Sequence, residues 1–201
     1  MLTLKEIDKF CKSGKFYLEL DLPVIPEELL PRNFNLTPIF RDRVLDYGAD
    51  HHLNNVFVKP PLYSIYSYHN TVALNFIENV IEFPYSRHRV IYITTENYNN
   101  GKMLPHTDSD RKFAINYFIE TGGENVITSW YKEKSKPIYD RHSVDGHNKQ
   151  VNTGTILKYE DLELLDSVKC QKNKWYIIRT DVIHDVVNLH GIRTMISIGL
   201  Q

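Results

Sequence analysis

The stretch KFAINYFIETGGENVITSWY (112–131) holds two runs rich in β-branched and aromatic residues, with Gly122-Gly123 between them. Such runs, bounded by glycine and polar residues, are typical of β-strands. Short β-rich runs separated by polar turns recur from residue 88 onward, and Asp145-Gly146 marks a further turn. The other runs are RVIYIT (89–94), GTILKY (154–159), KWYIIRT (174–180) and RTMISIG (193–199). Six to eight short strands at this spacing predict a β-sandwich or a jelly roll rather than a parallel α/β sheet.

The N-terminal third predicts two helices and a strand. Thr3 and Glu6 have the spacing of a capping box for a helix that ends by Gly14, and KFYLELDL (15–22) alternates like a strand. A second helix begins after Asn70 and stops before Pro84. Its apolar stripe consists of Ala73, Phe76, Ile77, Val80 and Ile81. We expect one domain over 1–201, in which residues 1–87 pack on a β core formed by 88–201.

The bulk composition excludes several classes of protein. The 201 residues are 42% apolar and 24% charged, with a formal net charge of -1, so no electrostatic attraction to nucleic acid or anionic lipid is expected. Cys11 and Cys170 lie far apart in sequence, which favours two reduced thiols in a cytoplasmic protein. MLTLKEIDKF (1–10) lacks the apolar region of a signal peptide, and no stretch reaches the length of a membrane span. The sequence therefore predicts a soluble, cytoplasmic protein.

Two segments carry residues suited to chemistry, LPHTDSDR (104–111) and IHDVVNLHGIR (183–193). His106 and Asp108 are two apart, so in extended backbone both side chains project to the same side and can bind one metal ion. His184 is the candidate third ligand, on or just after the strand 174–180. Two imidazoles and one carboxylate leave three positions open on a six-coordinate ion, an arrangement that suits non-haem Fe(II).

Arg193 follows His184 by nine residues. A tight turn at Asn188–Gly191 would reverse the chain and bring Arg193 back along the neighbouring strand. There its guanidinium could pair bidentately with a carboxylate whose other end chelates the metal. A 2-oxo dicarboxylate is the simplest ligand that meets both demands.

The order His106-Thr107-Asp108, His184, Arg193 resembles the H-x-D…H…R signature of the Fe(II)/2-oxoglutarate-dependent oxygenases. ENYNNGKMLPHTD (96–108) and RKFAINYFIETGG (111–123) are similar to the flanking segments of the prolyl-hydroxylase-like branch. The resemblance covers residues 88–200 and implies a double-stranded β-helix, the jelly roll that cupins share. It further implies Fe(II) held by the two histidines and the aspartate, 2-oxoglutarate held by the arginine, and dioxygen as the other co-substrate.

The resemblance also indicates further contacts to 2-oxoglutarate. Tyr98 stands near a tyrosine that lines this pocket in relatives. A second family tyrosine falls on Phe118 here, so Asn116, on the same face of the strand, or Tyr98 would supply the second contact. Many relatives have serine two residues after the arginine; this chain has Met195 there, and Ser197 is next on that face.

The activity implied by the resemblance is decarboxylation of 2-oxoglutarate to succinate, coupled to oxidation of a substrate C–H bond, as in a hydroxylase. The primary substrate, a protein side chain or a small molecule, stays open. A cupin-like isomerase, or a non-catalytic jelly roll that binds a metal or a sugar, would share the fold without needing Arg193. Asp110 is a rival to Asp108 but lacks its two-residue spacing from His106. His51-His52 and the loop 140–150 have no such arrangement of carboxylate, histidine and arginine.

Overall fold

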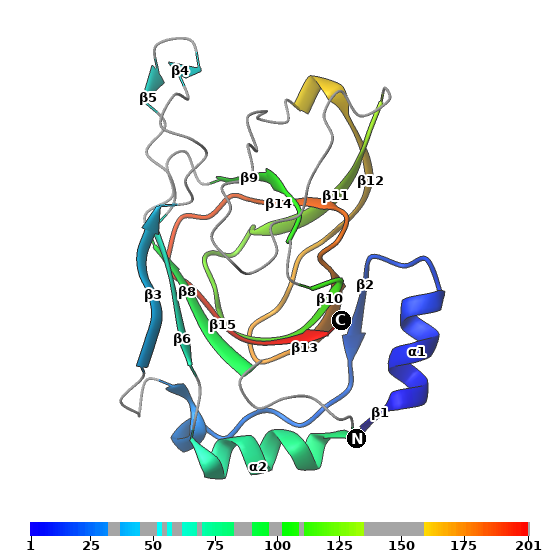
Figure 1. Ribbon diagram of the computed structural model, residues 1–201, viewed down its shortest axis with the longest axis vertical. Coiled ribbons are helices and arrows are strands. Elements are labelled where there is room, and N and C mark those ends of the chain that lie inside the picture. The colour runs from blue at the N-terminus through cyan, green and yellow to red at the C-terminus, as the bar shows by residue number, and fades with distance from the viewer. Residues whose placement is uncertain are drawn as a thin grey trace.

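The computed structural model describes residues 1–31, 37–44, 52–53, 56–57, 62–67, 70–82, 90–96, 102–108, 111–134 and 159–200. Most regular structure in these residues is β-strand, arranged in two large sheets, with two α-helices beside them (Figure 1). The predicted mainly β character is therefore confirmed. The architecture is compatible with a β-sandwich or a jelly roll.

The larger sheet has seven antiparallel strands in the order β2-β13-β10-β15-β8-β6-β3. Their bounds are Tyr17–Leu20 for β2, Trp175–Arg179 for β13, Phe113–Thr121 for β10, Arg193–Leu200 for β15, Val90–Glu96 for β8, Leu62–Ser67 for β6 and Thr37–Val44 for β3. Three of these strands come from the first 87 residues. That part of the chain therefore contributes to the sheet itself as well as packing on it.

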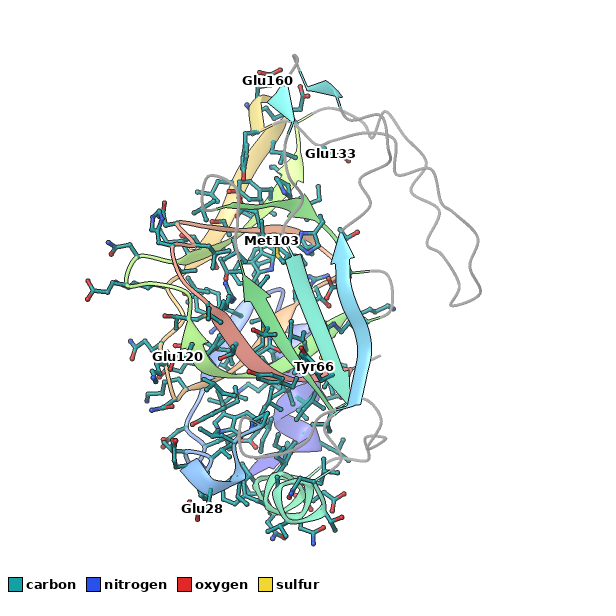
Figure 2. The ribbon with its side chains drawn as sticks, turned by 90° about the vertical axis from the view of Figure 1, so that its left-hand side faces the viewer. Glu28, Tyr66, Met103, Glu120, Glu133 and Glu160 are labelled. Carbon is teal, nitrogen blue, oxygen red and sulfur yellow. The ribbon has the colours of Figure 1, made fainter. Side chains whose placement is uncertain are left out.

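The smaller sheet has four antiparallel strands in the order β12-β11-β14-β9. Their bounds are Leu162–Val168 for β12, Ile127–Glu133 for β11, Ile183–Val187 for β14 and Lys102–His106 for β9. Two short pairs complete the described strands: β1 (Leu2–Thr3) with β7 (Ile81–Glu82), and β4 (His52–Leu53) with β5 (Val56–Phe57). Figure 2 shows Met103 among strands of the smaller sheet and Tyr66 among those of the larger one.

From β8 onward the chain passes repeatedly between the two large sheets. β8, β10, β13 and β15 belong to the larger sheet, whereas β9, β11, β12 and β14 belong to the smaller one. The turn at Gly122-Gly123 therefore does not join neighbouring strands, because it carries the chain from β10 in one sheet to β11 in the other. Residues close in sequence thus come to face each other across the space between the sheets.

Both predicted helices are confirmed. α1 (Leu4–Lys12) starts at the Thr3–Glu6 capping box, in which each side chain bonds the other residue's backbone N–H. α2 (Thr71–Val80) starts at Asn70, whose side chain accepts from the Ala73 N–H at 2.8 Å. Short 3-10 helices span Glu27–Leu29 (η1) and Tyr159–Asp161 (η5). None of the helices in the described ranges has the length and apolar character that a membrane crossing requires.

The helices cover the outer face of the larger sheet, as Figure 1 shows at its lower side. Odd-numbered residues of β10, such as Ile115 and Tyr117, pack here with Phe10 of α1 and Ile77 of α2. The even-numbered residues of β10 point the other way, toward the smaller sheet, because successive strand residues alternate. They belong to a second cluster, here called the inner core. Its buried members are Ala114, Phe118, Trp130, Cys170, Tyr176 and Ile178.

The remaining expectations about the strands have different outcomes. GTILKY (154–159) lies outside the described residues except for Tyr159, which belongs to η5 and not to a strand. The strand β12 was not predicted, because LELLDSV exposes most of its residues and lacks an apolar face. Of the two placements expected for His184, on or just after the strand 174–180, the second is found: His184 follows β13 in sequence and lies in β14 of the opposite sheet. The expected placement of Arg193 is wrong, because β15 belongs to the larger sheet and is not a neighbour of β14.

Candidate metal centre

Within the described residues, one group has the composition and spacing to hold a metal ion: His106, Asp108 and His184. One ligand atom from each residue lies within 4.8 Å of the other two. His106 ends β9, Asp108 follows two residues later, and His184 lies in β14. The structure thus brings together the three residues that the sequence analysis selected as ligands.

The two histidines meet because β9 and β14 are antiparallel neighbours in which His106 pairs directly with His184. Their ring centroids are 4.4 Å apart. The register shifts beside this pair: Val186 pairs with Met103, so two residues of β9 stand opposite Asp185 alone. This is the pattern of a β-bulge, a feature that re-aims side chains near functional sites. Pro105 is one of the two extra residues, and bulges are among the few strand positions that tolerate proline.

The orientation of the His184 ring leaves one nitrogen for a metal. Its Nδ1 lies 2.9 Å from the Val182 carbonyl oxygen, which can only accept, so Nδ1 carries the proton. Nε2 then keeps its lone pair, the form in which imidazole binds metal ions. Burial lowers the pKa of His184 to about 4, so the neutral ligand form prevails at neutral pH.

The Asp108 carboxylate is held by its neighbours. Arg111 Nε donates to Oδ2 at 2.8 Å, while Oδ1 lies 3.7 Å from His106 Nε2. Burial by itself would raise the pKa of this carboxyl group, but the Arg111 guanidinium, followed by His184 and His106, outweighs it and lowers the pKa to about 2. The backbone N–H of Asp108 donates to the Thr180 carbonyl at 2.8 Å, which fixes the segment after β9. A negative charge is thus present where a cation would bind.

Arg193 is buried, 5% exposed, at the start of β15. Its guanidinium carbon lies 4.9 Å from the ring centroid of Phe118, an inner-core residue. Its Nη2 donates to Thr128 Oγ1 at 3.4 Å, across the space between β15 and β11. The turn before it depends on Gly122, whose carbonyl accepts from the backbone N–H groups of His190 and Gly191. Arg193 is therefore an arginine directed between the sheets and not a surface ion-pair partner.

Thr128, the hydrogen-bond partner of Arg193, lies on the same face of the smaller sheet as His184. His184 pairs directly with Trp130, so the two side chains lie on the same face of the smaller sheet. Thr128 is two residues from Trp130 and shares that face. Two residues along a strand span about 7 Å, so the side chains of His184 and Thr128 both point into the space between the two sheets.

The other predicted contact residues have different outcomes. Asn116 and Ser197 are cross-strand partners, and both are buried. Asn116 is on the inner face of β10, and its Oδ1 has no hydrogen-bond partner. Ser197 Oγ accepts from Arg111 Nη1 at 2.9 Å, which connects it with Asp108 through one arginine. Tyr98 lies outside the described residues, as do Asp110, His51 and the loop 140–150.

Sequence reasoning assigned no role to Arg111, Thr128 or Asp185. The three-residue spacing from Asp108 was the available signal for Arg111, whereas only the strand pairing identifies Thr128. Asp185 is fully buried on the opposite face of β14 from His184. Its Oδ2 accepts from the hydroxyls of Tyr159 at 2.7 Å and Tyr131 at 3.2 Å, and burial raises the pKa of its carboxyl group. It stands outside the three-residue metal group.

Comparison with known proteins assigns no family to the chain. No protein-family model matches it, and no curated protein matches it. Among solved structures, the X-ray structure of E. coli ycfD aligns with a TM-score of 0.47 and 12% sequence identity. The alignment covers 100% of this chain and 54% of that one, so the chain spans about half the length of that protein. A likeness of this degree carries no assignment of activity.

Proposed function

We propose that this chain is an Fe(II)- and 2-oxoglutarate-dependent oxygenase that oxidises a C–H bond of its substrate, as a hydroxylase does. The observation that carries the proposal is the pairing of two features in one inter-sheet space. One is a group of two imidazoles and one carboxylate within 4.8 Å, and the other is the buried Arg193. A metal group alone fits many proteins, but a buried arginine that faces the same space offers the carboxylate of a co-substrate a charged group to pair with.

The topology supports the proposal. From β8 to β15 the chain adds four strands to each sheet and passes repeatedly between the sheets, which is the arrangement expected of a double-stranded β-helix. The candidate ligands lie on β9, just after it, and on β14, and these two strands are neighbours at one edge of the smaller sheet (Figure 1). The arginine enters from the larger sheet. Each sheet thus contributes one half of the proposed binding site.

The residues present fit iron. Nε2 of His184 is available because Nδ1 makes the hydrogen bond to Val182. With an imidazole nitrogen of His106 and an oxygen of the ionised Asp108, the donor set is two nitrogens and one oxygen. Three protein ligands leave room for a bidentate co-substrate and dioxygen, as non-haem Fe(II) requires. When bound, iron with 2-oxoglutarate and dioxygen supplies the oxidising power, and the protein supplies binding, orientation and exclusion of water.

The chain's own residues have the following proposed roles. Arg193 binds the far carboxylate of 2-oxoglutarate through its planar fork, and the Thr128 hydroxyl is placed to donate a second hydrogen bond to it. Asn116 is a further candidate contact, because its buried Oδ1 lacks a partner in the protein. Tyr98 and Ser197 remain proposed contacts to 2-oxoglutarate on the basis of the sequence resemblance to this family. The buried rings of the inner core exclude water and so strengthen these polar interactions.

The test of this proposal is succinate formation. Protein reconstituted with Fe(II) under nitrogen is mixed with 2-oxoglutarate and then exposed to dioxygen, and succinate is quantified by mass spectrometry. We expect succinate that depends on both Fe(II) and 2-oxoglutarate, and none from His184→Ala protein treated identically. A protein that binds the metal but neither binds nor consumes 2-oxoglutarate would instead be a non-catalytic jelly roll or a cupin-like isomerase.

A further inference from the structure

Arg111 occupies the gap between the metal group and the strand that carries Arg193. It lies just before β10, with its side chain 15% exposed. Its Nε donates to Oδ2 of Asp108 at 2.8 Å, and its Nη1 donates to Oγ of Ser197 at 2.9 Å. One guanidinium therefore connects a candidate metal ligand with β15.

The backbone on both sides of this contact is fixed. Thr180 accepts from the Asp108 N–H through its carbonyl and donates from its hydroxyl to the Arg111 carbonyl at 2.9 Å. The Arg111 stem lies against β15 at Gly199, where an added Cβ would come within 3.4 Å of Arg111 Cδ. The position of the Arg111 side chain is therefore fixed relative to Asp108. Arg111 bonds to Oδ2, and Oδ1 is the carboxylate oxygen that lies near His106.

We propose that Arg111 is a positioning residue that restricts Asp108 to one metal-binding oxygen. A carboxylate can bind a metal through one oxygen or chelate it through both. With a charged N–H group on Oδ2, chelation would break a charge-assisted hydrogen bond in a largely buried setting. Oδ1 is then the oxygen available to the ion.

The consequence concerns the number of open coordination positions, and it rests on the proposed function. Two histidines and a one-oxygen carboxylate occupy three of six positions, and the remaining three admit a bidentate 2-oxo acid and dioxygen. A chelating Asp108 would take a fourth position and leave too few for both co-substrates. The second bond of Arg111 braces this arrangement against Ser197, which lies on the same face of β15 as Arg193.

The test counts metal-bound waters with Mn(II) as the probe, because Mn(II) accepts the same ligands and its waters relax bulk water protons. Relaxivity is measured for the wild type, Arg111→Met, Arg111→Lys and Ser197→Ala. Arg179→Met is the matched control, since the guanidinium of Arg179, on β13, also donates two hydrogen bonds, both to Asp181 just after that strand. Each protein is first checked for folding by its thermal melt.

We expect relaxivity per bound Mn(II) to fall by about one third in Arg111→Met, as Asp108 takes one of three open positions. Arg111→Lys should fall by less, because lysine keeps the charge without the planar fork. Ser197→Ala, which removes only the brace on Arg111, should fall by less than Arg111→Met. Arg179→Met should match the wild type. Should Arg111→Met fail to fold, Arg111→Lys carries the test.

Wild-type relaxivity in both Arg111 variants would overturn the inference. This result is separable from failure of the proposed function. If the proposed function fails but the inference about Arg111 holds, Arg111→Met still loses a metal-bound water, whereas 2-oxoglutarate displaces no water from the wild-type Mn(II) protein.

Discussion

His106 and His184 are direct cross-strand partners whose ring centroids lie 4.4 Å apart, although 78 residues separate them in the chain. Side chains of residues that face each other on antiparallel strands are held close by the backbone ladder itself. The histidine pair is therefore held together by the sheet itself, and Asp108 joins it from the segment after β9. A metal ion could bind such a group without reorganising the fold.

Removing either imidazole should abolish tight metal binding. His106→Ala and His184→Ala should each weaken Fe(II) binding by more than roughly 100-fold, since losing even an outer-shell partner costs about 10–100-fold. The control is His190→Ala, because His190 is exposed in the turn between β14 and β15. Anaerobic titration with Fe(II) gives the dissociation constants. Tight binding that survives in both ligand variants would exclude this triad as the site.

The stability of the metal-free protein should fall as the pH drops from 6.5 toward 4. Burial lowers the pKa of His184 from 6.5 to about 4, so the unfolded state binds more protons within that window. The stability associated with neutral His184 is complete above pH 6.5 and is lost as the pH approaches 4, by an amount on the order of 3 kcal/mol. Asp108, with its pKa lowered to about 2, stays ionised throughout.

Urea unfolding in the presence of a chelator, at pH 7 and pH 4.5, measures this effect. His184→Asn cannot take up a proton, so the difference between the two pH values should shrink in that variant. An equal loss of stability in the wild type and in His184→Asn would show that protonation of His184 contributes nothing.

Trp130 connects the N-terminal segment to the inner core, and shortening it should destabilise the whole domain. It is fully buried, stacks on Tyr17 with ring centroids 5.6 Å apart, and donates from Nε1 to the Arg179 carbonyl at 2.9 Å. Trp130→Phe keeps a ring but removes the donor and leaves a cavity, which should cost on the order of 1–3 kcal/mol of unfolding free energy.

The measurement is urea denaturation, with Leu164→Ala as control because Leu164 is 57% exposed on β12. That control should stay within about 0.5 kcal/mol of the wild type. A wild-type unfolding free energy in Trp130→Phe would contradict the packing described between β2 and β11.

Gly122 should tolerate no side chain. Its φ is +88°, and an added Cβ would come within 2.6 Å of Leu189 Cδ2 and 3.2 Å of Arg193 Cβ. We expect Gly122→Ala to lose about 1–3 kcal/mol of stability and to weaken 2-oxoglutarate binding, because Arg193 must shift. Thermal melts and anaerobic titration measure the two effects. Unchanged 2-oxoglutarate affinity in a folded Gly122→Ala protein would show that this turn does not position Arg193.

Local signals in the sequence predicted local structure well. The capping box at Thr3 and the cap at Asn70 determine helix starts through contacts three residues away, so both helices were found. The strand β12 was missed because it is an edge strand with exposed leucines, and its pairing with β11 supplies what its own pattern lacks. Periodicity reports which face is buried, not which strand lies alongside.

In the candidate site, too, contacts that are local in the sequence were predicted and contacts between distant strands were not. The two-residue spacing of His106 and Asp108 predicted that they would lie together, and His184 joined them. However, the expectation that Arg193 returns along the strand beside His184 was wrong, because the turn at 188–191 carries the chain into the other sheet. Thr128 could not be assigned a role for a similar reason, because its contact with Arg193 spans 65 residues of the chain. The spacing of Arg111 from Asp108 was visible in the sequence, but its contact with Ser197, which spans 86 residues, was not.

The most direct test of the proposed function is the affinity of Fe(II)-loaded protein for 2-oxoglutarate, followed under nitrogen by the metal-to-ligand absorbance band. Arg193→Ala should lose about 2–4 kcal/mol of binding free energy, roughly 30- to 1,000-fold in Kd, with Fe(II) affinity nearly unchanged. Arg193→Lys should lose less, since the charge remains without the two-point fork. An unchanged Kd in Arg193→Ala would place this arginine outside any co-substrate pocket and contradict the oxygenase assignment.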